Sequence, residues 1–104
     1  MEDITILDLY LQRREDAIIY TEEKYGDRLR RIALGMLQDT QAAEECENDT
    51  YLDAWNRIPP HKPYTYLFSF LSCALRRIAI DFCRQRSALK RSGMVVELTE
   101  EMAQ

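Results

Sequence analysis

The chain has 104 residues, 46% of them hydrophobic and 31% charged, which is the composition of one small globular domain. Its longest uncharged run, residues 63–75, is too short and too polar to cross a bilayer, so we expect no membrane-spanning segment. The start, "MEDITILDLY", is acidic where a secretory signal would be basic, and a cytoplasmic location is therefore expected.

Residues that could build an active site or a metal site are sparse. The three cysteines are never spaced as C-x-x-C, and His61 is the single histidine. A metal cage needs more ligands at closer spacing, and no nucleophile has an adjacent base. We therefore expect no metal, no cofactor and no enzymatic activity.

Charge is divided unevenly along the chain, whose formal net charge is −4. Residues 1–61 hold seven Lys or Arg and fourteen Asp or Glu, a net charge of −7. Residues 62–92 hold seven Lys or Arg and one acid, a net charge of +6, and residues 93–104 carry −3. Such asymmetry indicates two different partners. The alternative for the basic part is a solvated helix face.

Apolar residues recur at intervals of three and four, which predicts an all-α domain of three to four helices. The first predicted helix runs from Ile4 to about Arg13, and the second from about Asp16 to Leu37. Gly26 lies inside the second pattern and costs about 1 kcal/mol relative to alanine, so the pattern allows a kink or break there.

The third predicted helix runs from about Gln41 to Arg57. Asp39 or Thr40 is suited to cap its start. Pro59 and Pro60 end it, because proline lacks the amide hydrogen that a helix needs. Its inward side is predicted to carry Ala43, Cys46, Thr50, Ala54 and Ile58.

The last predicted helix begins near Tyr64, after the loop "PPHKPY", and continues to about Lys90. One side is apolar, while the opposite side carries a basic stripe. The basic stripe consists of Arg76, Arg77, Arg84 and Arg91. The helix is expected to end at Gly93, so that residues 1–92 form the domain and residues 93–104 a linker or a short extra helix.

The outward side of the third helix forms an acidic face. Carboxylates three and four residues apart repel one another, so an external partner best explains this pattern. A basic protein is the favoured partner, a plain solvated face is the alternative, and a metal is disfavoured because one convex helix face spreads its ligands. The acidic face comprises Glu44, Glu45, Asn48, Asp49 and Asp53.

An aromatic group lies between the acidic face and the basic stripe in the sequence. Aromatic residues at this density are usually core residues, yet exposed rings beside arginines are also what a single-stranded nucleic-acid site requires. The group consists of Trp55, Tyr64, Tyr66, Phe68 and Phe70.

Two segments, "YGDRLRRIALGMLQDTQAAEECENDTYLDAWNRIPP" and "FLSCALRRIAIDFCRQR", resemble region 2 of a bacterial RNA polymerase sigma factor of the extracytoplasmic-function type. The resemblance covers about residues 10–92. It implies a non-catalytic factor in transcription initiation and its regulation. Relatives usually continue past a linker into a second helical domain that reads the −35 element.

The resemblance also implies two partners. The acidic face (Glu44, Glu45, Asn48, Asp49 and Asp53) would dock on the clamp helices of the largest subunit of core RNA polymerase. The last helix and its preceding loop would bind the single-stranded non-template strand of the promoter −10 element. An anti-sigma protein is left open as a third partner. The implied DNA-binding residues are Arg57, Tyr64, Phe70, Arg76, Arg77, Arg84 and Arg86.

Three positions depart from the family pattern. Ala42 replaces the usual aspartate, and Glu47 stands where an apolar residue is more common. Arg77 stands where most relatives have asparagine, which can pair with a base edge, whereas arginine brings charge and a planar stacking surface. Base preference at Arg77 is therefore expected to differ.

Two rival functions remain open. A free-standing DNA-binding regulator would explain the basic helix but leaves the acidic face unexplained, and a comparison of duplex with single-stranded DNA would identify it. A helical protein-interaction module, such as an antagonist of a sigma factor, would use both charged faces as protein contacts. Indifference to DNA would favour the second rival.

Overall fold

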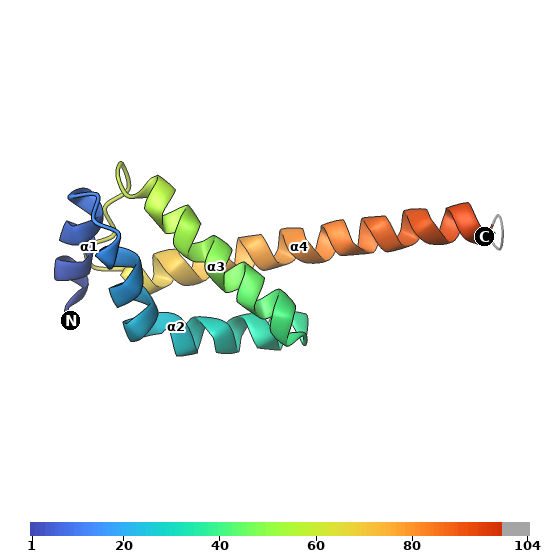
Figure 1. The fold of residues 1–104 in the computed structure, drawn as a ribbon, viewed down its shortest axis with the longest axis horizontal. Coiled ribbons are helices and arrows are strands. Elements are labelled where there is room, and N and C mark those ends of the chain that lie inside the picture. Colours follow the sequence, from blue (N-terminus) through green and yellow to red (C-terminus); the bar gives the residue numbers. More distant parts are fainter. Residues whose placement is uncertain (99–104) are drawn as a thin grey trace.

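The computed structural model describes residues 1–98, and side chains as far as residue 87. This part of the chain contains four α-helices and no strand. The all-α prediction is confirmed. The helices are α1 (Asp3–Leu11), α2 (Asp16–Leu37), α3 (Thr40–Arg57) and α4 (Leu67–Leu98), as Figure 1 shows.

Helix α1 packs its apolar side against the start of α2. Ile6, Leu7 and Tyr10 are fully buried. The hydroxyl of Thr21 on α2 donates to the carbonyl of Ala17 at 2.7 Å, which leaves its oxygen to accept a hydrogen bond from the Tyr10 hydroxyl at 2.8 Å. The buried phenol therefore has a partner, as buried polar groups require.

Helix α2 is one helix through Gly26, so no break occurs there. Figure 1 shows its ribbon bending near the middle of its length, where Gly26 lies. A Cβ on Gly26 would lie 3.2 Å from the Tyr51 hydroxyl and 3.3 Å from Glu47 Oε2, both on α3. The glycine thus allows α2 and α3 to approach closely.

Helix α3 begins and ends where the sequence predicts. The Asp39 carboxylate caps its start by accepting hydrogen bonds from the amides of Gln41 and Ala42, at 3.0 and 3.3 Å. The helix ends at Arg57, just before the two prolines. All the residues predicted to face inward are buried: Ala43, Cys46, Thr50, Ala54 and Ile58.

Helix α4 differs from its prediction at both ends. It begins at Leu67, three residues later than Tyr64, and its first hydrogen bond joins the Phe70 amide to the Tyr66 carbonyl at 2.9 Å. The predicted end at Gly93 is wrong, because α4 continues to Leu98. A single glycine costs about 1 kcal/mol relative to alanine, and no proline follows to stop the helix.

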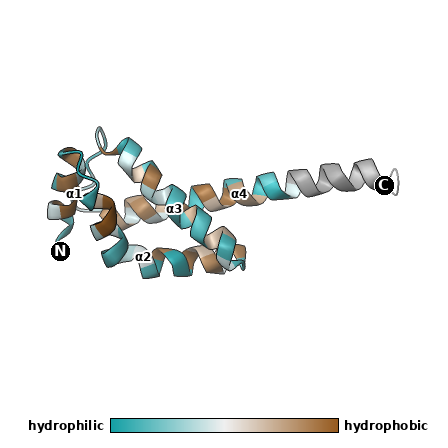
Figure 2. Cartoon of the chain, in the orientation of Figure 1, coloured by the Kyte–Doolittle hydropathy of each residue, from teal (hydrophilic) through white to brown (hydrophobic). Residues whose placement is uncertain are grey.

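Helices α2, α3 and α4 surround the main core, and α1 covers one end of it (Figure 1). Apolar and hydrophilic positions alternate along these helices, as expected where each helix buries one side (Figure 2). Among the described residues, no helix is long and apolar enough to span a membrane. The side chains of Leu89, Lys90 and Arg91, and residues 99–104, lie outside the described part.

Candidate functional site

Four members of the acidic face point outward from α3. Glu44, Glu45, Asn48 and Asp49 are exposed. Within the part of the chain whose side chains are described, none of the four has a side-chain hydrogen bond or an ion pair. The exposed carboxylates are therefore available to an external partner. Leu52, on the same helix, is 55% exposed.

Asp53 differs from the other members of the acidic face. Its side chain is only 20% exposed, and both of its oxygens are bonded to arginines. Arg57 Nε donates to Oδ2 at 3.0 Å, and Arg77 Nη2 on α4 donates to Oδ1 at 3.1 Å. Asp53 thus connects α3 to α4 instead of facing outward with its neighbours.

A pocket of about 320 Å³ lies between the end of α3, the following loop and the start of α4. The Arg57 guanidinium lies 4.5 Å from the centre of the Phe70 ring, and the His61 ring lies 5.8 Å from that ring. The pocket therefore combines cationic donors with ring faces. Its lining residues are Arg57, His61, Tyr66, Ser69, Phe70, Cys73 and Arg77; we call it the α3–α4 pocket.

The structure brings three of the predicted DNA-binding residues together in this pocket: Arg57, Phe70 and Arg77. Tyr64 is 37% exposed on the preceding loop but does not line the pocket. Arg76 is exposed on α4. Three of the predicted DNA-binding residues therefore meet in the α3–α4 pocket, while Tyr64 and Arg76 are exposed outside it.

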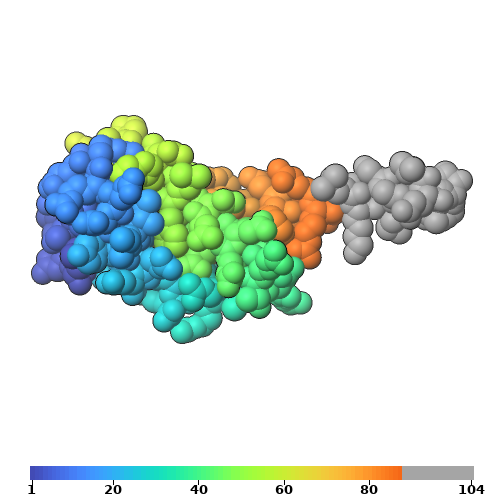
Figure 3. All heavy atoms as spheres, viewed as in Figure 1, coloured from blue at the N-terminus to red at the C-terminus, as the bar shows by residue number. Residues whose placement is uncertain are grey.

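The two remaining predicted residues lie further along α4. Arg84 is exposed, and its guanidinium lies 3.9 Å from Asp81. Arg86 turns toward the start of α3, where its Nη1 lies 3.7 Å from Asp39 Oδ2, and its guanidinium lies 5.4 Å from the Phe82 ring. Figure 3 shows α4, in orange, beside the start of α3, in green. Arg86 therefore points away from the pocket.

Some pocket residues were missed by the sequence analysis. The missed residues on α4 are Ser69 and Cys73, which lie at intervals of three and four between Tyr66, a member of the aromatic group, and Arg77, a predicted DNA-binding residue. This spacing is visible in the sequence and could have identified them. His61 has no such local signal, since a loop brings it to the pocket.

Phe68 is directed away from this pocket. Its ring packs 5.1 Å from the Tyr25 ring of α2, and the Arg28 guanidinium lies 4.0 Å from its centre. Trp55 is half-buried and carries the Arg13 guanidinium 3.8 Å from its ring centre. These two aromatic residues contribute to packing between helices.

Residues 23–89 of the chain match the family model for sigma-70 region 2. The chain belongs to the sigma-70 region 2 family. Members of this family are non-catalytic domains that act in transcription initiation and its regulation. They interact with core RNA polymerase and bind promoter DNA. Searches of curated proteins and of solved structures gave no match to the chain.

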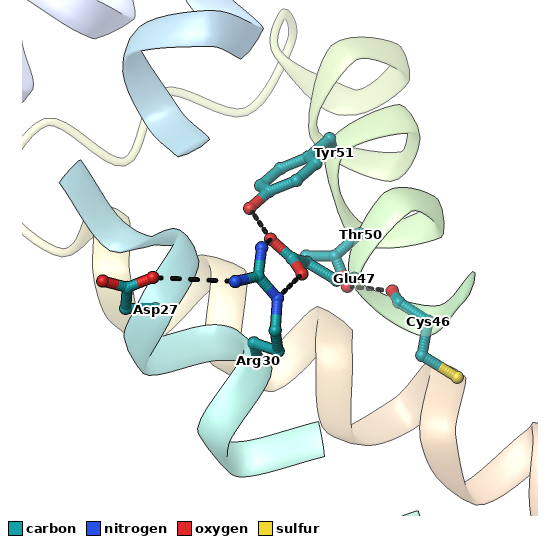
Figure 4. A network of polar contacts seen from close by, with 6 residues as sticks. All are labelled: Asp27, Arg30, Cys46, Glu47, Thr50 and Tyr51. Atoms are coloured by element: carbon teal, nitrogen blue, oxygen red, sulfur yellow. Dashed lines mark hydrogen bonds and ion pairs between the residues drawn. The ribbon is translucent and has the colours of Figure 1, made fainter. Parts of the chain in front are cut away.

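This sigma-70 region 2 domain holds a buried carboxylate that the sequence analysis noted only as a departure. The Glu47 side chain is 3% exposed on α3. Arg30 of α2 donates to it twice, from Nε at 2.9 Å and from Nη2 at 3.2 Å, and the Tyr51 hydroxyl donates to Oε2. Figure 4 shows this network, with Asp27 3.6 Å from Arg30.

The network holds the Tyr51 hydroxyl in its protonated form. Burial raises the pKa of Tyr51, and the hydrogen bond to the Glu47 carboxylate and the charge of that carboxylate raise it further. The phenol is therefore a permanent donor to Glu47. Because Glu47 is buried on the side of α3 that packs against α2, the network joins these two helices.

Arg13 lies outside the residues that match sigma-70 region 2. It adopts a left-handed backbone conformation with φ of 58° after α1. Its Nη1 donates to the carbonyls of Trp55 and Ile58, at 2.9 and 2.7 Å. These are carbonyls at the end of α3, which lack helical partners, so Arg13 satisfies them where the pocket's loop begins.

Proposed function

We propose that this chain is region 2 of a sigma factor of the extracytoplasmic-function type. In this proposal it docks on the clamp helices of core RNA polymerase and captures the melted non-template strand of the promoter −10 element. The observation that carries the proposal is the placement of the two kinds of charge. Four exposed members of the acidic face have no hydrogen bond or ion pair to any side chain up to residue 87, while Arg57 and Arg77 line a pocket with Phe70.

Docking is assigned to Glu44, Glu45, Asn48 and Asp49. These side chains share the outer side of one helix, and their unpaired oxygens fit a partner surface that carries arginines or lysines. Leu52 adds exposed apolar area to this side. The buried Glu47 network supports docking indirectly, because it anchors the opposite side of α3 to α2.

DNA capture is assigned to the α3–α4 pocket and the exposed arginines beside it. Opening base pairs costs on the order of 1 to 2 kcal/mol of stacking per step, so melting requires contacts that exist only with separated strands. A base that enters the pocket can stack on a ring and accept hydrogen bonds from Arg57 or Arg77. Stacking on an aromatic side chain contributes roughly 1 to 3 kcal/mol per base. Arg76 and Arg84 supply phosphate contacts along α4.

Two pairs of substitutions separate the two activities. Asn48→Lys with Asp49→Lys reverses the charge of the docking surface, so co-purification with core polymerase should be lost while binding of single-stranded DNA persists. Arg76→Ala with Arg77→Ala should weaken binding of single-stranded DNA by about tenfold or more and leave polymerase association intact.

Each pair serves as the control for the other. Circular dichroism and thermal unfolding establish that both double variants fold. Polymerase binding that survives the lysine pair would contradict the docking assignment. Equal affinity of the unmodified protein for duplex and single-stranded DNA would instead favour a duplex-binding regulator, and no affinity for DNA would favour a protein-interaction module.

A further inference from the structure

Asp53 is the residue that joins the two arginines of the α3–α4 pocket. Its carboxylate accepts from Arg57 Nε at 3.0 Å and from Arg77 Nη2 at 3.1 Å, one arginine on each oxygen. Arg57 is one helical turn further along α3, and Arg77 reaches across from α4. Both guanidinium groups line the pocket, whereas Asp53 is only 20% exposed. The carboxylate therefore lies behind the pocket's cationic wall.

This arrangement limits the freedom of the arginines without using up their donors. An arginine side chain carries about 2 kcal/mol of rotamer entropy, which a ligand must otherwise overcome. Each guanidinium has five N–H groups and gives one of them to Asp53. Arg57 is held further by the Phe70 ring, 4.5 Å from its guanidinium. The remaining donors are thus held in place before a base arrives.

The carboxylate also changes the charge of the pocket. Arg57 and Arg77 alone would attract any phosphate, because backbone attraction does not depend on sequence. The partly exposed negative charge of Asp53 between them reduces that attraction, so directional hydrogen bonds to a base edge make up a larger share of the binding free energy. Weaker attraction to phosphates and a larger share of base-edge hydrogen bonds make binding depend more on the base that enters the pocket.

We propose that Asp53 is a positioning residue of the α3–α4 pocket, which fixes Arg57 and Arg77 for base recognition and suppresses binding that is indifferent to sequence. This inference rests on the proposed function and deepens it. It also assigns Asp53 to the DNA-binding side of the domain, in place of the polymerase contact implied by the family resemblance. The four exposed members of the acidic face keep the docking role.

The test is Asp53→Asn, which keeps the side chain's shape and removes its charge. Affinity is measured for single-stranded oligonucleotides of about ten nucleotides that differ by one base at a time. Loss of the carboxylate should raise affinity for the weakest oligonucleotides by about two- to fivefold, the effect of one partly exposed charge. The ratio between the best and the worst oligonucleotide should fall by about fivefold or more, because a well-placed bidentate pair discriminates by that amount.

Asp8→Asn is the matched control, since Asp8 is exposed on α1 and belongs to neither surface. It removes the same charge and should leave the ratio unchanged. Asp53→Glu keeps the charge and should restore low affinity for the weakest oligonucleotides. A purely structural role for Asp53 would lower all affinities together and would reduce the thermal stability of Asp53→Asn.

Three outcomes overturn the proposal. An unchanged ratio in Asp53→Asn together with loss of core polymerase binding returns Asp53 to the docking surface. Uniformly lower affinities with unfolding at a lower temperature assign it a structural role only. If the unmodified protein binds no single-stranded DNA, the proposed function fails and this inference fails with it. The measurement on the unmodified protein distinguishes this outcome from the other two, which appear only in Asp53→Asn.

Discussion

Glu47 shows how a single residue can depend on partners from another helix. A buried carboxylate is costly unless it is paired and hydrogen-bonded, and here Arg30 and Tyr51 supply three donors. Gly26 provides the space for them, since a Cβ there would crowd both Glu47 and Tyr51. The buried carboxylate is thus matched by a coordinated set of residues on two helices.

Replacing Glu47 by leucine should expose the cost of leaving its partners behind. Arg30 is 38% exposed and can regain water, but the buried Tyr51 hydroxyl would lose its acceptor. We expect Glu47→Leu to lower the free energy of unfolding by about 1 to 3 kcal/mol. The double variant with Tyr51→Phe should recover part of that loss. Urea unfolding of the four proteins of this cycle measures the coupling, and strict additivity would contradict the network.

Asp53 and Glu47 also mark where sequence analysis reaches its limit. Local spacing places both on α3 and correctly predicts which side of the helix most residues take. Each has one partner four positions further along α3, but Arg30 lies 17 positions from Glu47 and Arg77 lies 24 positions from Asp53, both on other helices, so no local pattern reveals those two. Arg57, Phe70 and Arg77 were predicted as site residues and Tyr66 was named in the aromatic group, whereas Ser69 and Cys73 needed a search for helical spacing around them.

At the scale of elements, the predicted helices agree best where a capping signal marks a boundary. Asp39 and the prolines define the ends of α3 in the sequence and in the structure alike. Helix α4 has no such signal near Tyr64, and its start depends on how the proline loop packs. Gly93 is a weak signal without a following proline, and the helix passes through it.

The contact between α1 and α2 includes an ion pair that should respond to pH. Burial raises the pKa of Asp3, but hydrogen bonds from Lys24 Nζ at 2.8 Å and from the Tyr25 hydroxyl at 2.8 and 2.9 Å outweigh it, so the net shift is downward. A carboxyl whose pKa is lowered by folding stabilises the folded state above its unfolded pKa and loses that contribution as the pH falls.

Asp3→Asn should therefore destabilise the protein near neutral pH and not at low pH. The difference in unfolding free energy from the unmodified protein should be fully present above the ordinary aspartate pKa of 3.8 and should shrink as the pH falls below it. Thermal unfolding at a series of pH values measures it, with Asp8→Asn as the control. A difference that grows on acidification would contradict the assigned pairing.

At the scale of the whole molecule, the two charged surfaces remain separate. Among the side chains that the structure describes, the exposed acids of α3 have no ion pair, and the paired arginines in or against α4 use Asp53, Asp81 and Asp39. The acidic and basic sets therefore do not neutralise each other, except through Asp53. A protein with a net charge of −4 can in this way present cations to a polyanion on one side.

This separation predicts that DNA binding depends on salt concentration. With two phosphate contacts, from Arg76 and Arg84, the logarithm of the affinity for single-stranded DNA should fall with the logarithm of salt concentration with a slope of about −1.4. Arg76→Ala should reduce the magnitude of that slope by about 0.7, the share of one phosphate. Fluorescence anisotropy at several salt concentrations measures both, and a slope near zero would rule out the basic side of α4 as the DNA surface.

The hydrogen bonds from Arg13 to the carbonyls of Trp55 and Ile58 bear on how this domain can be dissected. A fragment trimmed to the family match, residues 23–89, would retain every pocket-lining side chain and yet lose the group that holds the last turn of α3 beside the proline loop. Such a fragment would contain all the lining residues of the α3–α4 pocket but not the Arg13 hydrogen bonds to the end of α3. The working unit for binding studies therefore begins with α1.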